Sequence, residues 1–316
     1  MSSFTVISPG MLTTIQDGGR FSHQHSGMCV SGVMDAYAHR TANILCGNSD
    51  QNEAVIEVSM IGPTLKFNSD AFISITGANI SPMIDERIVK MWSSFPIYEG
   101  NHLSFGKIKS GVRSYIGIYG GIDVPKVLSS KSTYTMAGIG GYNGRALQTG
   151  DEINLNTNTI TNARFRELPL KYVPQYKNEK EINVVLGPQD NAFTSNGLYN
   201  FLSQQYTVTP KFNRMGYRLD GPKIEHSEKA DIISDGIVMG AIQVTGEGLP
   251  IILMSDRQTA GGYTKIACVI QRDLSEIAQA NINNKLKFYA ISVEQAQVEY
   301  IKWENKFKEI TDELYN

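Results

Sequence analysis

The sequence predicts a mainly β protein with two domains and a few helices, on three observations. Short apolar runs of strand length recur along the chain, and Gly, Pro, Asn and Asp separate them at intervals typical of barrels and sandwiches. A chain of 316 residues has room for about two domains of roughly 150 residues each. A charged stretch with two prolines, residues 164–181, interrupts the strand pattern. We therefore predict one domain over residues 1–165 and a second over residues 180–316.

The predicted strands are short runs rich in β-branched, aromatic and other apolar residues. They cover residues 4–7, 54–58, 71–76, 88–92, 114–119, 182–186, 237–244, 249–254 and 286–291. An internal repeat accompanies them, because residues 56–59 resemble residues 242–245 and, at the same offset, Ser69-Asp70 matches Ser255-Asp256. This repeat favours two related β domains over one large sheet.

The predicted helices are few. Asp35 is a suitable N-cap for a helix over Ala36–Cys46, and Gly47 follows where a left-handed C-terminal residue is needed. Two further helices are predicted over residues 191–205 and 273–280.

The last predicted helix begins at Ser292, because Ser292 and Gln295 have the spacing of a capping box. Apolar residues then recur at alternating spacings of three and four as far as Leu314, which places them in one stripe along the helix. The stripe predicts a helix packed across its own domain or at a contact between subunits. A coiled coil is the alternative.

Composition and charge exclude several classes of protein. The formal net charge of −2 provides no basic face for nucleic acid. No apolar run is long enough to span a bilayer, and the first residues lack the basic and apolar segments of an export signal. Cys29, Cys46 and Cys268 lie far apart with no CxxC spacing, as expected of reduced, buried thiols. We therefore expect a cytoplasmic protein.

Several catalytic and cofactor motifs are absent from the sequence. It contains no P-loop, no GxSxG turn, no HExxH and no dinucleotide-binding glycine pattern. No lysine is flanked by methionine on both sides, so the usual biotin attachment signal is missing. His23 and His25 would share a strand face but lack a third ligand in register, so no metal site is predicted. We expect this chain to bind no cofactor by itself.

The densest group of chemically useful residues lies between residues 234 and 265. The strand predicted over residues 249–254 leads directly into Ser255-Asp256-Arg257-Gln258-Thr259, and Gly261-Gly262 then allow a tight turn before Tyr263 and Lys265. A strand that ends on donors, acceptors and charges is typical of a small-molecule site. An ordinary polar hairpin turn is the alternative.

Three other Gly-rich polar loops have the same character, over residues 12–35, 117–134 and 213–220. Each carries charges that a simple loop does not need. A structural explanation is the alternative for these loops. Their glycine pairs can be required only for the backbone conformation of a turn. Neighbouring Asp and Arg side chains more often form structural ion pairs than catalytic groups. From the residues alone, we predict a polar small-molecule site but no particular reaction.

Nine motifs follow one another along nearly the whole chain. They are LTTIQDGGR from Leu12, SGVMD from Ser31, GGIDVP from Gly120, NRMG from Asn213, RLDG from Arg218, SDGI from Ser234, GAIQV from Gly240, DRQT from Asp256 and GGY from Gly261. In this order they resemble the family of biotin-dependent carboxyltransferases and 5-oxoprolinase C subunits, also called KipA-like or allophanate hydrolase subunit 2. One departure concerns Phe212, since relatives commonly have Ser before the NRMG-type motif.

The resemblance implies two cyclophilin-like β-barrel domains and work within a complex. Members act with a KipI-like B-type partner and an A-type partner of another fold, and together they open 5-oxoproline to L-glutamate with ATP. The leading hypothesis is therefore the C component of an ATP-dependent 5-oxoprolinase, inactive when alone.

Two alternatives to this hypothesis stay open. One is a biotin-dependent carboxyltransferase subunit, which would transfer a carboxyl group to urea or a related amide from carboxybiotin on a separate biotin carboxyl carrier protein. The other is a regulator that binds a KipI-like partner and relieves inhibition of a kinase.

The family motifs supply the candidate site residues, chosen for their chemistry. Reactions at an amide need donors aimed at a developing oxyanion and a bidentate partner for a carboxylate or carbonyl. The predicted catalytic group is Asp235, Asp256, Arg257 and Lys265. The predicted substrate-binding group is Arg214, Arg218, Gln243, Gln258, Thr259 and Tyr263, with an N-terminal cluster of Asp17, Arg20 and Asp35.

Overall fold

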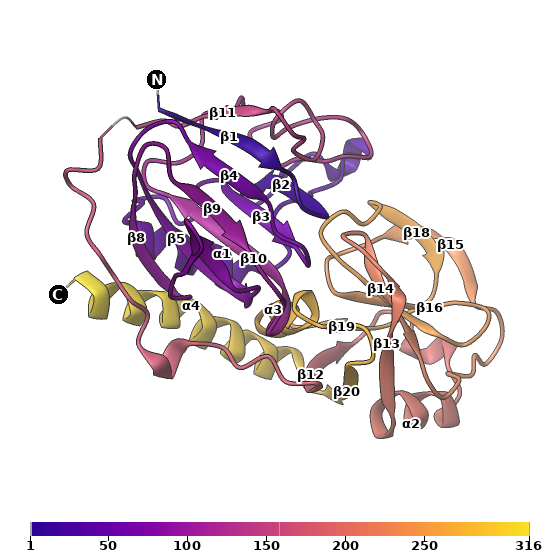
Figure 1. Cartoon of the computed structure of the whole chain (residues 1–316). Helices are drawn as coiled ribbons and strands as arrows, with labels where there is room; N and C mark the ends of the chain where they lie inside the picture. Colours follow the sequence, from indigo (N-terminus) through magenta and orange to yellow (C-terminus); the bar gives the residue numbers. More distant parts are fainter. Residues whose placement is uncertain (1, 158, 316) are drawn as a thin grey trace. The chain divides into compact units, whose positions relative to one another are not determined.

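Strands dominate the regular structure of residues 2–157 and 159–315, the parts of the chain that this computed structural model describes (Figure 1). The predicted mainly β class with a few helices is confirmed. The chain divides into two units. Unit 1 holds Met1–Arg20, Ser31–Gln175 and Lys306–Asn316, and unit 2 holds Phe21–Val30 and Tyr176–Asn305. Each unit therefore takes one short segment from the part of the chain that mainly builds the other.

Unit 1 is built from two sheets around one apolar core. The first sheet has the order β11 (Glu152–Asn154), β1 (Ser3–Ser8), β4 (Thr64–Phe67), β9 (His102–Phe105), β6 (Pro82–Ile84) and β7 (Arg87–Ile88). The second has the order β2 (Leu12–Gln16), β3 (Val55–Ser59), β10 (Ser110–Ile118), β5 (Ala71–Asn79) and β8 (Ser93–Ile97). Phe4 and Phe67 of the first sheet share a buried cluster with Ile56 and Ile116 of the second, so the core lies between the sheets.

Helix α1 (Ala36–Cys46) packs on the second sheet of unit 1, and both of its ends are as predicted. The Asp35 side chain accepts a hydrogen bond from Ala38 N at 3.0 Å, and Gly47 has a left-handed φ of 88°. On the sheet side, Thr76 Oγ1 of β5 donates to Ala38 O at 2.8 Å. Sequence signals at the helix ends thus determined where this helix starts and stops.

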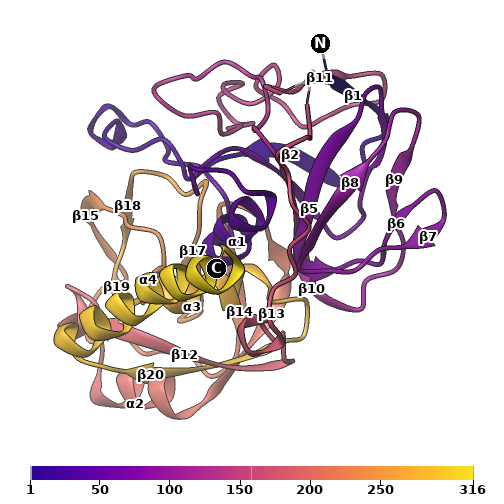
Figure 2. The ribbon, with the colours of Figure 1, turned by 90° about the vertical axis from the view of Figure 1, so that its left-hand side faces the viewer.

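Helix α4 (Val293–Tyr315) begins with the predicted capping box. Ser292 N donates to Gln295 Oε1 at 2.9 Å, and Gln295 N donates to Ser292 Oγ at 3.2 Å. Within unit 1, Phe307 of α4 is buried, and its ring centroid lies 5.5 Å from that of Tyr37 on α1. Figure 2 shows the C-terminal part of α4 beside α1. The C-terminal part of the predicted apolar stripe therefore packs into a domain core.

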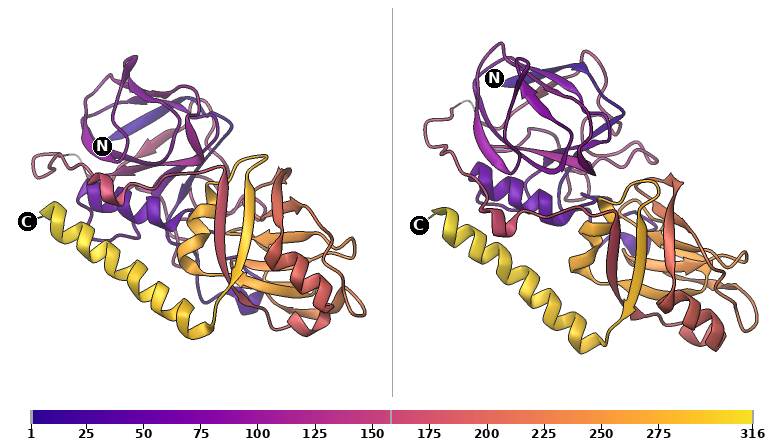
Figure 3. Two further views of the ribbon diagram at one scale, coloured as in Figure 1. Left: turned by 90° about the horizontal axis from the view of Figure 1, so that it is seen from below. Right: turned by 60° about the horizontal axis from the view of Figure 1, so that its bottom comes forward.

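Unit 2 contains a closed barrel. Its strand order is β12 (Glu179–Leu186), β19 (Lys265–Val269), β16 (Ala241–Val244), β17 (Pro250–Leu253), β14 (Gly216–Asp220), β13 (Gln205–Phe212) and β20 (Lys285–Ala290). Strands β12 and β20 are parallel, and the other neighbouring pairs are antiparallel. Figure 3 shows α2 (Ser195–Ser203) beside these strands and α4 continuing from the end of β20.

Unit 2 also has a two-stranded ribbon outside the barrel order. It pairs β15 (Asp231–Gly236) with β18 (Ala260–Tyr263), and β18 leads through Thr264 directly into barrel strand β19. The remaining helices of the described chain are α3 (Gln271–Ala278) and the 3-10 helices Gln24–Ser26, Leu170–Tyr172 and Asp190–Ala192. Tyr263 of the ribbon lines the pocket described below.

The prediction of one strand over residues 237–244 is wrong. Strand β15 ends at Gly236, the chain then turns, and only Ala241–Val244 enters the barrel as β16. Gly240 has a φ of 86°, a conformation that glycine adopts without a steric penalty. An apolar run that looked continuous is therefore divided by one glycine.

Two other predicted elements are shorter than expected. The strand predicted over residues 88–92 stops at Ile88, and the chain reaches β8 only after Trp92, whose φ is 57°. The helix predicted over residues 191–205 is reduced to α2, which starts after Thr194 because its Oγ1 caps Gly197 N at 3.0 Å.

The sequence repeat also has no simple counterpart in strand pairing. Strands β16 and β17 are neighbours in the barrel, whereas the matching strands β3 and β4 belong to different sheets of unit 1.

We expect Gly240→Ala to lower the free energy of unfolding by about 1–3 kcal/mol, because alanine is strained at a left-handed φ. Its Cβ would also lie 2.9 Å from Leu274 Cδ2 and 3.0 Å from Val269 O. Gly236→Ala is the matched control, since nothing lies within 4 Å of its added Cβ. Urea unfolding midpoints measure both variants, and equal midpoints would contradict the role given to Gly240.

Candidate functional site

Strand register in the unit 2 barrel separates inward from outward side chains. Tyr217 and Ile252 pair across β14 and β17 and are fully buried, so their row fills the barrel. Successive side chains along a strand alternate between its two faces. The next row therefore points outward, with Arg218 opposite Ile251 and Ile251 opposite Gln243. An isoleucine flanked by a cation and an amide thus faces away from the barrel core.

A pocket of about 510 Å³ lies over this outward row, and all of its lining belongs to unit 2. Its volume is usual for a small-molecule site. Its apolar lining is Pro210, Phe212, Met215, Gly216, Ile251 and Leu253. Its polar lining is Lys211, Asn213, Arg218, Gln243, Gln258 and Tyr263. Four of the predicted substrate-binding residues therefore line one pocket.

The two glutamine side chains of the pocket converge at Gly261 of the ribbon. A Cβ added at Gly261 would lie 2.8 Å from Gln243 Nε2 and 3.5 Å from Gln258 Nε2. Gln243 is buried, and its Nε2 donates to Tyr263 O at 3.4 Å. This hydrogen bond is longer than usual, so it restrains the Gln243 amide only weakly. Glycine at this position lets the ribbon approach both amides closely.

Arg214 and Asp256 form a buried ion pair and do not line the pocket. Arg214 Nε and Nη2 donate to the two carboxylate oxygens of Asp256, each at 2.9 Å. A second link joins the same residues, because Asp256 N donates to Arg214 O at 2.8 Å. The fork geometry fixes the turn between β13 and β14 against the end of β17. This pair therefore shapes the wall of the pocket from behind.

Arg257 is also buried outside the pocket lining. Its Nε donates to Ile237 O and its Nη1 to Met254 O, both at 3.3 Å. Burial lowers the pKa of Arg257 from its ordinary value. Ile237 N in turn donates to Thr259 O at 3.0 Å. The segment after β17 is thus attached to the turn after β15 through Arg257 and Thr259.

Lys265 and Asp235 link the barrel to the ribbon. Lys265 Nζ lies 2.9 Å from Asp235 Oδ2, and the lysine is buried while the aspartate is exposed. The hydrogen bond from Lys265 lowers the pKa of Asp235. A carboxylate with a lowered pKa is a weaker base. The pair is therefore better suited to orientation than to proton transfer.

The N-terminal candidate Asp17 belongs to unit 1, where it is surrounded by donors. Ser130 Oγ donates to its carboxylate at 2.6 Å, Ser132 Oγ at 2.5 Å, Lys131 N at 2.6 Å and Gly19 N at 2.9 Å. Burial acts to raise the pKa of Asp17, but these donors outweigh it and the pKa is lowered. Asp17 therefore organises the loop over residues 117–134.

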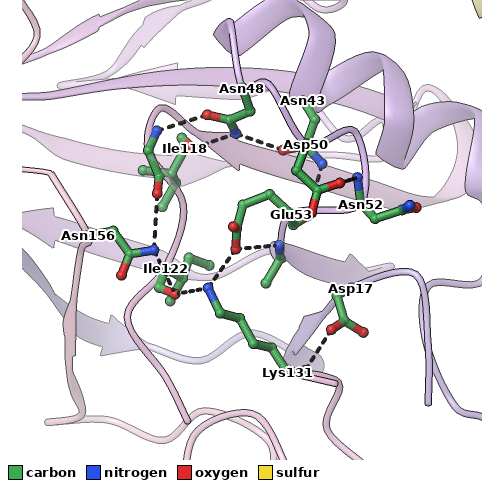
Figure 4. Close-up of polar contacts among 12 residues, drawn as sticks. Asp17, Asn43, Asn48, Asp50, Asn52, Glu53, Ile118, Ile122, Lys131 and Asn156 are labelled. Atoms are coloured by element: carbon green, nitrogen blue, oxygen red, sulfur yellow. Dashed lines mark hydrogen bonds and ion pairs between the residues drawn. The ribbon is translucent and has the colours of Figure 1, made fainter. Parts of the chain in front are cut away.

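The same loop is held by a second set of contacts, shown in Figure 4. Lys131 Nζ lies 2.6 Å from Glu53 Oε1 and donates to Ile122 O at 2.8 Å. Asn48 and Asn156 secure the turn at Gly120, because Gly120 N donates to Asn48 Oδ1 and Asn156 Nδ2 donates to Gly120 O. The charge of Lys131 is thus engaged in the fold of unit 1.

The other two N-terminal candidates are engaged in the same way. Arg20 is fully buried, with its Nε 3.0 Å from Val127 O and its Nη2 2.7 Å from Ser132 O. Asp35 caps helix α1. Neither they nor Asp17 line the unit 2 pocket.

We expect acid to destabilise unit 1 through Asp17. Its folded pKa is below the ordinary 3.8, so the unfolded chain binds the proton first as the pH falls. The stability that Asp17 provides is full above about pH 4 and is lost as the pH falls through the folded pKa. Asp17→Asn should be less stable than the unchanged chain at about pH 7 and lose less on acidification to about pH 3. Urea unfolding at both pH values tests this, and an unchanged acid loss in the variant would contradict it.

Lys211 was not among the predicted residues, Asn213 was named only as the start of the NRMG motif, and Phe212 only as a departure from the family. All three line the pocket. The Phe212 ring stacks on Tyr217, with centroids 5.0 Å apart and an interplanar angle of 27°. Pro210 is the sequence feature that could have indicated Lys211. Proline within a strand is typical of an edge or a bulge, where a neighbouring side chain can turn toward a pocket.

Two kinds of feature are absent from the part of the chain that the structure describes. No group of three or more His, Cys, Asp or Glu side chains in residues 2–157 and 159–315 is placed to hold a metal ion. No helix of that part of the chain has the length and apolar character to cross a membrane.

Comparisons with known proteins give a consistent family. A family described as carboxyltransferase domain, subdomain A and B, matches residues 26–290. The 5-oxoprolinase C subunit of Escherichia coli is 33% identical over 311 residues, or 98% of each chain. That of Haemophilus influenzae is 36% identical, over 90% of this chain and 89% of its own. The solved structure of K. lactis urea amidolyase matches 98% of this chain at 28% identity with a TM-score of 0.91.

These similarities differ in how much of each relative they cover. This chain spans nearly all of the E. coli protein but only 20% of the K. lactis one. The resemblance predicted from nine sequence motifs is confirmed by the family match and by both bacterial relatives. The chain is a member of the carboxyltransferase domain family with subdomains A and B.

Proposed function

We propose that this chain is the C component of an ATP-dependent 5-oxoprolinase and works with a KipI-like B-type partner and an A-type partner. Two relatives named as C subunits of 5-oxoprolinase align with 98% and 90% of this chain. The structural observation that carries the proposal is the convergence of Gln243 and Gln258 in a pocket of about 510 Å³. Primary amides both donate and accept hydrogen bonds, as the edge of a lactam requires.

The reaction adds water across the lactam C–N bond of 5-oxoproline. The ring nitrogen leaves as an amine after gaining a proton, and the carbonyl carbon becomes a second carboxylate. In this chain, Gln243 and Gln258 would hold the lactam N–H and C=O, with the Tyr263 hydroxyl as a further donor. Ile251 and Leu253 would contact the ring methylenes.

The buried cations have a supporting role in this proposal. Arg214, Arg257 and Lys265 already bind Asp256, two backbone carbonyls and Asp235, respectively. They would position the pocket walls rather than contact substrate. Since the sequence has no P-loop, a partner protein would bind ATP, and the isolated chain is expected to be inactive.

Carboxyl transfer to urea or a related amide is the second candidate. The similarity to K. lactis urea amidolyase, with a TM-score of 0.91, favours it. The same pair of glutamines would hold an amide there, while carboxybiotin would come from a biotin carboxyl carrier protein.

ATP-dependent release of glutamate from 5-oxoproline tests the proposed function. The assay combines this chain with its A-type and B-type partners and omits each in turn. We expect glutamate only from the complete mixture. A stable complex that releases no glutamate, yet carboxylates urea when biotin carboxylase and carrier are supplied, would favour the second candidate.

A further inference from the structure

The pocket has a charged side as well as an amide side. Lys211 and Arg218 both line it, and both are exposed. No carboxylate of the described chain forms an ion pair with either residue, in contrast to Arg214 and Lys265 nearby. Two cations without a protein counterion therefore face one small-molecule pocket.

An irregularity in strand β13 brings these two cations together. The register places Val208 opposite Leu219 and then Phe212 opposite Tyr217, so Thr209–Lys211 lie opposite the single residue Arg218. The surplus residues form a bulge, which bends a strand and re-aims its side chains. Thr209 Oγ1 donates to Arg218 O at 2.8 Å and secures the bulge at this point. Lys211 and Arg218 are thus cross-strand neighbours because of the bulge.

The distance from this pair to the amide side suits a small bifunctional ligand. Arg218 lies opposite Ile251, and Ile251 lies opposite Gln243, so two strand spacings of about 5 Å each separate the arginine from the glutamine backbone. Both side chains point to the same outer face and extend into the pocket. A ligand with a carboxylate a few bonds from an amide can contact both at once.

We propose that Lys211 and Arg218 form a carboxylate subsite, and that this pocket selects small amides or lactams that carry a carboxylate over uncharged ones. The inference rests on the proposed function for the amide side of the pocket. Arg218 supplies a planar, bidentate donor set, and Lys211 supplies a mobile point charge. An uncharged amide such as urea would leave both cations without a partner.

Direct binding to the full-length chain tests the subsite. The probes are 5-oxoproline and 2-pyrrolidinone, the same lactam without the carboxylate, titrated by calorimetry or ligand-observed NMR. The unchanged chain should bind 5-oxoproline more tightly than 2-pyrrolidinone. The double variant Lys211→Ala with Arg218→Ala should lower this ratio of affinities, the preference, by about tenfold or more. Binding of 2-pyrrolidinone should stay the same. Arg218→Lys should recover part of the loss, and added salt should weaken 5-oxoproline binding only when the pair is intact.

Lys223→Ala is the matched control, because Lys223 is an exposed cation of unit 2 outside the pocket. The double variant is also assayed for glutamate release in the complete complex, where we expect a raised KM for 5-oxoproline. A double variant that keeps the full preference for 5-oxoproline would overturn the subsite, even if glutamate release confirms the proposed function. The double variant can also lose the preference for 5-oxoproline while the complex with the unchanged chain releases no glutamate. That pair of results would support the subsite and reject the proposed function. Failure of the unchanged chain to prefer the carboxylated lactam would reject the subsite outright.

Discussion

Asp256→Ala is expected to lower the free energy of unfolding by about 3–5 kcal/mol, the usual cost of removing one partner of a buried ion pair. Arg214 and Asp256 are 6% and 4% exposed, so water cannot replace the carboxylate that the substitution removes. The loss is large because the Arg214 guanidinium keeps its charge in a buried place while losing two hydrogen bonds of 2.9 Å. Urea unfolding of the purified chain measures this effect.

A double variant distinguishes the contribution of the ion pair to stability from that of side-chain packing. Arg214→Met with Asp256→Leu removes both charges, and apolar replacements of a buried pair are often neutral. We expect the double variant to be more stable than Asp256→Ala alone. Equal stability of Asp256→Ala and the unchanged chain would show that the pair does not hold the wall of the pocket.

Phe307→Ala is expected to cost about 3–5 kcal/mol of unfolding free energy, as for other large-to-small changes at buried aromatic positions. The Phe307 side chain is 1% exposed. One face meets Tyr37, and the Arg40 guanidinium carbon lies 3.7 Å from the ring centroid. Removing the ring would leave a cavity against α1 in the core of unit 1. Thermal unfolding followed by near-UV circular dichroism measures the loss.

Ile301→Ala on the same helix is the control for Phe307→Ala. Ile301 is 58% exposed, so its truncation should change the free energy of unfolding by less than about 0.5 kcal/mol. Similar losses for both variants would mean that the effect does not come from the burial of the Phe307 ring, since alanine itself favours the helix. A small loss for Phe307→Ala alone would contradict the assignment of residues 306–316 to unit 1.

Local signals in the sequence predicted the parts of the fold that depend on neighbouring residues. The caps of α1 and the start of α4 followed from Asp35, Gly47, Ser292 and Gln295, because each makes its bond within the same turn. Strand β5 followed from a continuous apolar run. Where one residue changes the backbone direction inside such a run, as Gly240 does, periodicity alone overestimated the strand.

Contacts between residues far apart in the sequence could not be predicted in this way. Nothing in residues 21–30 or 306–316 indicates which unit they join. The hydroxyl groups that donate to Asp17 belong to Ser130 and Ser132, more than a hundred residues away in the sequence. These hydrogen bonds could therefore not be predicted from the residues near Asp17. Likewise, the pocket depends on a bulge at Lys211 that arises only when β13 pairs with β14.

The candidate site was therefore predicted in part. Gln243, Gln258, Tyr263 and Arg218 were found from motif chemistry and line one pocket. The buried charges of the same motifs were chosen by the same reasoning, but residue type alone does not tell an ion pair inside the protein from a ligand contact.

The most direct test of this account is glutamate release by the complete complex with Gln243→Leu in this chain. Leucine is similar in size to glutamine and suits a buried position, but its side chain cannot form a hydrogen bond with an amide. We expect an intact complex whose kcat/KM for 5-oxoproline falls about tenfold or more, while Gln204→Leu, at an exposed position on unit 2, leaves kcat/KM unchanged. Full activity with Gln243→Leu would contradict the claim that the unit 2 pocket holds the substrate amide.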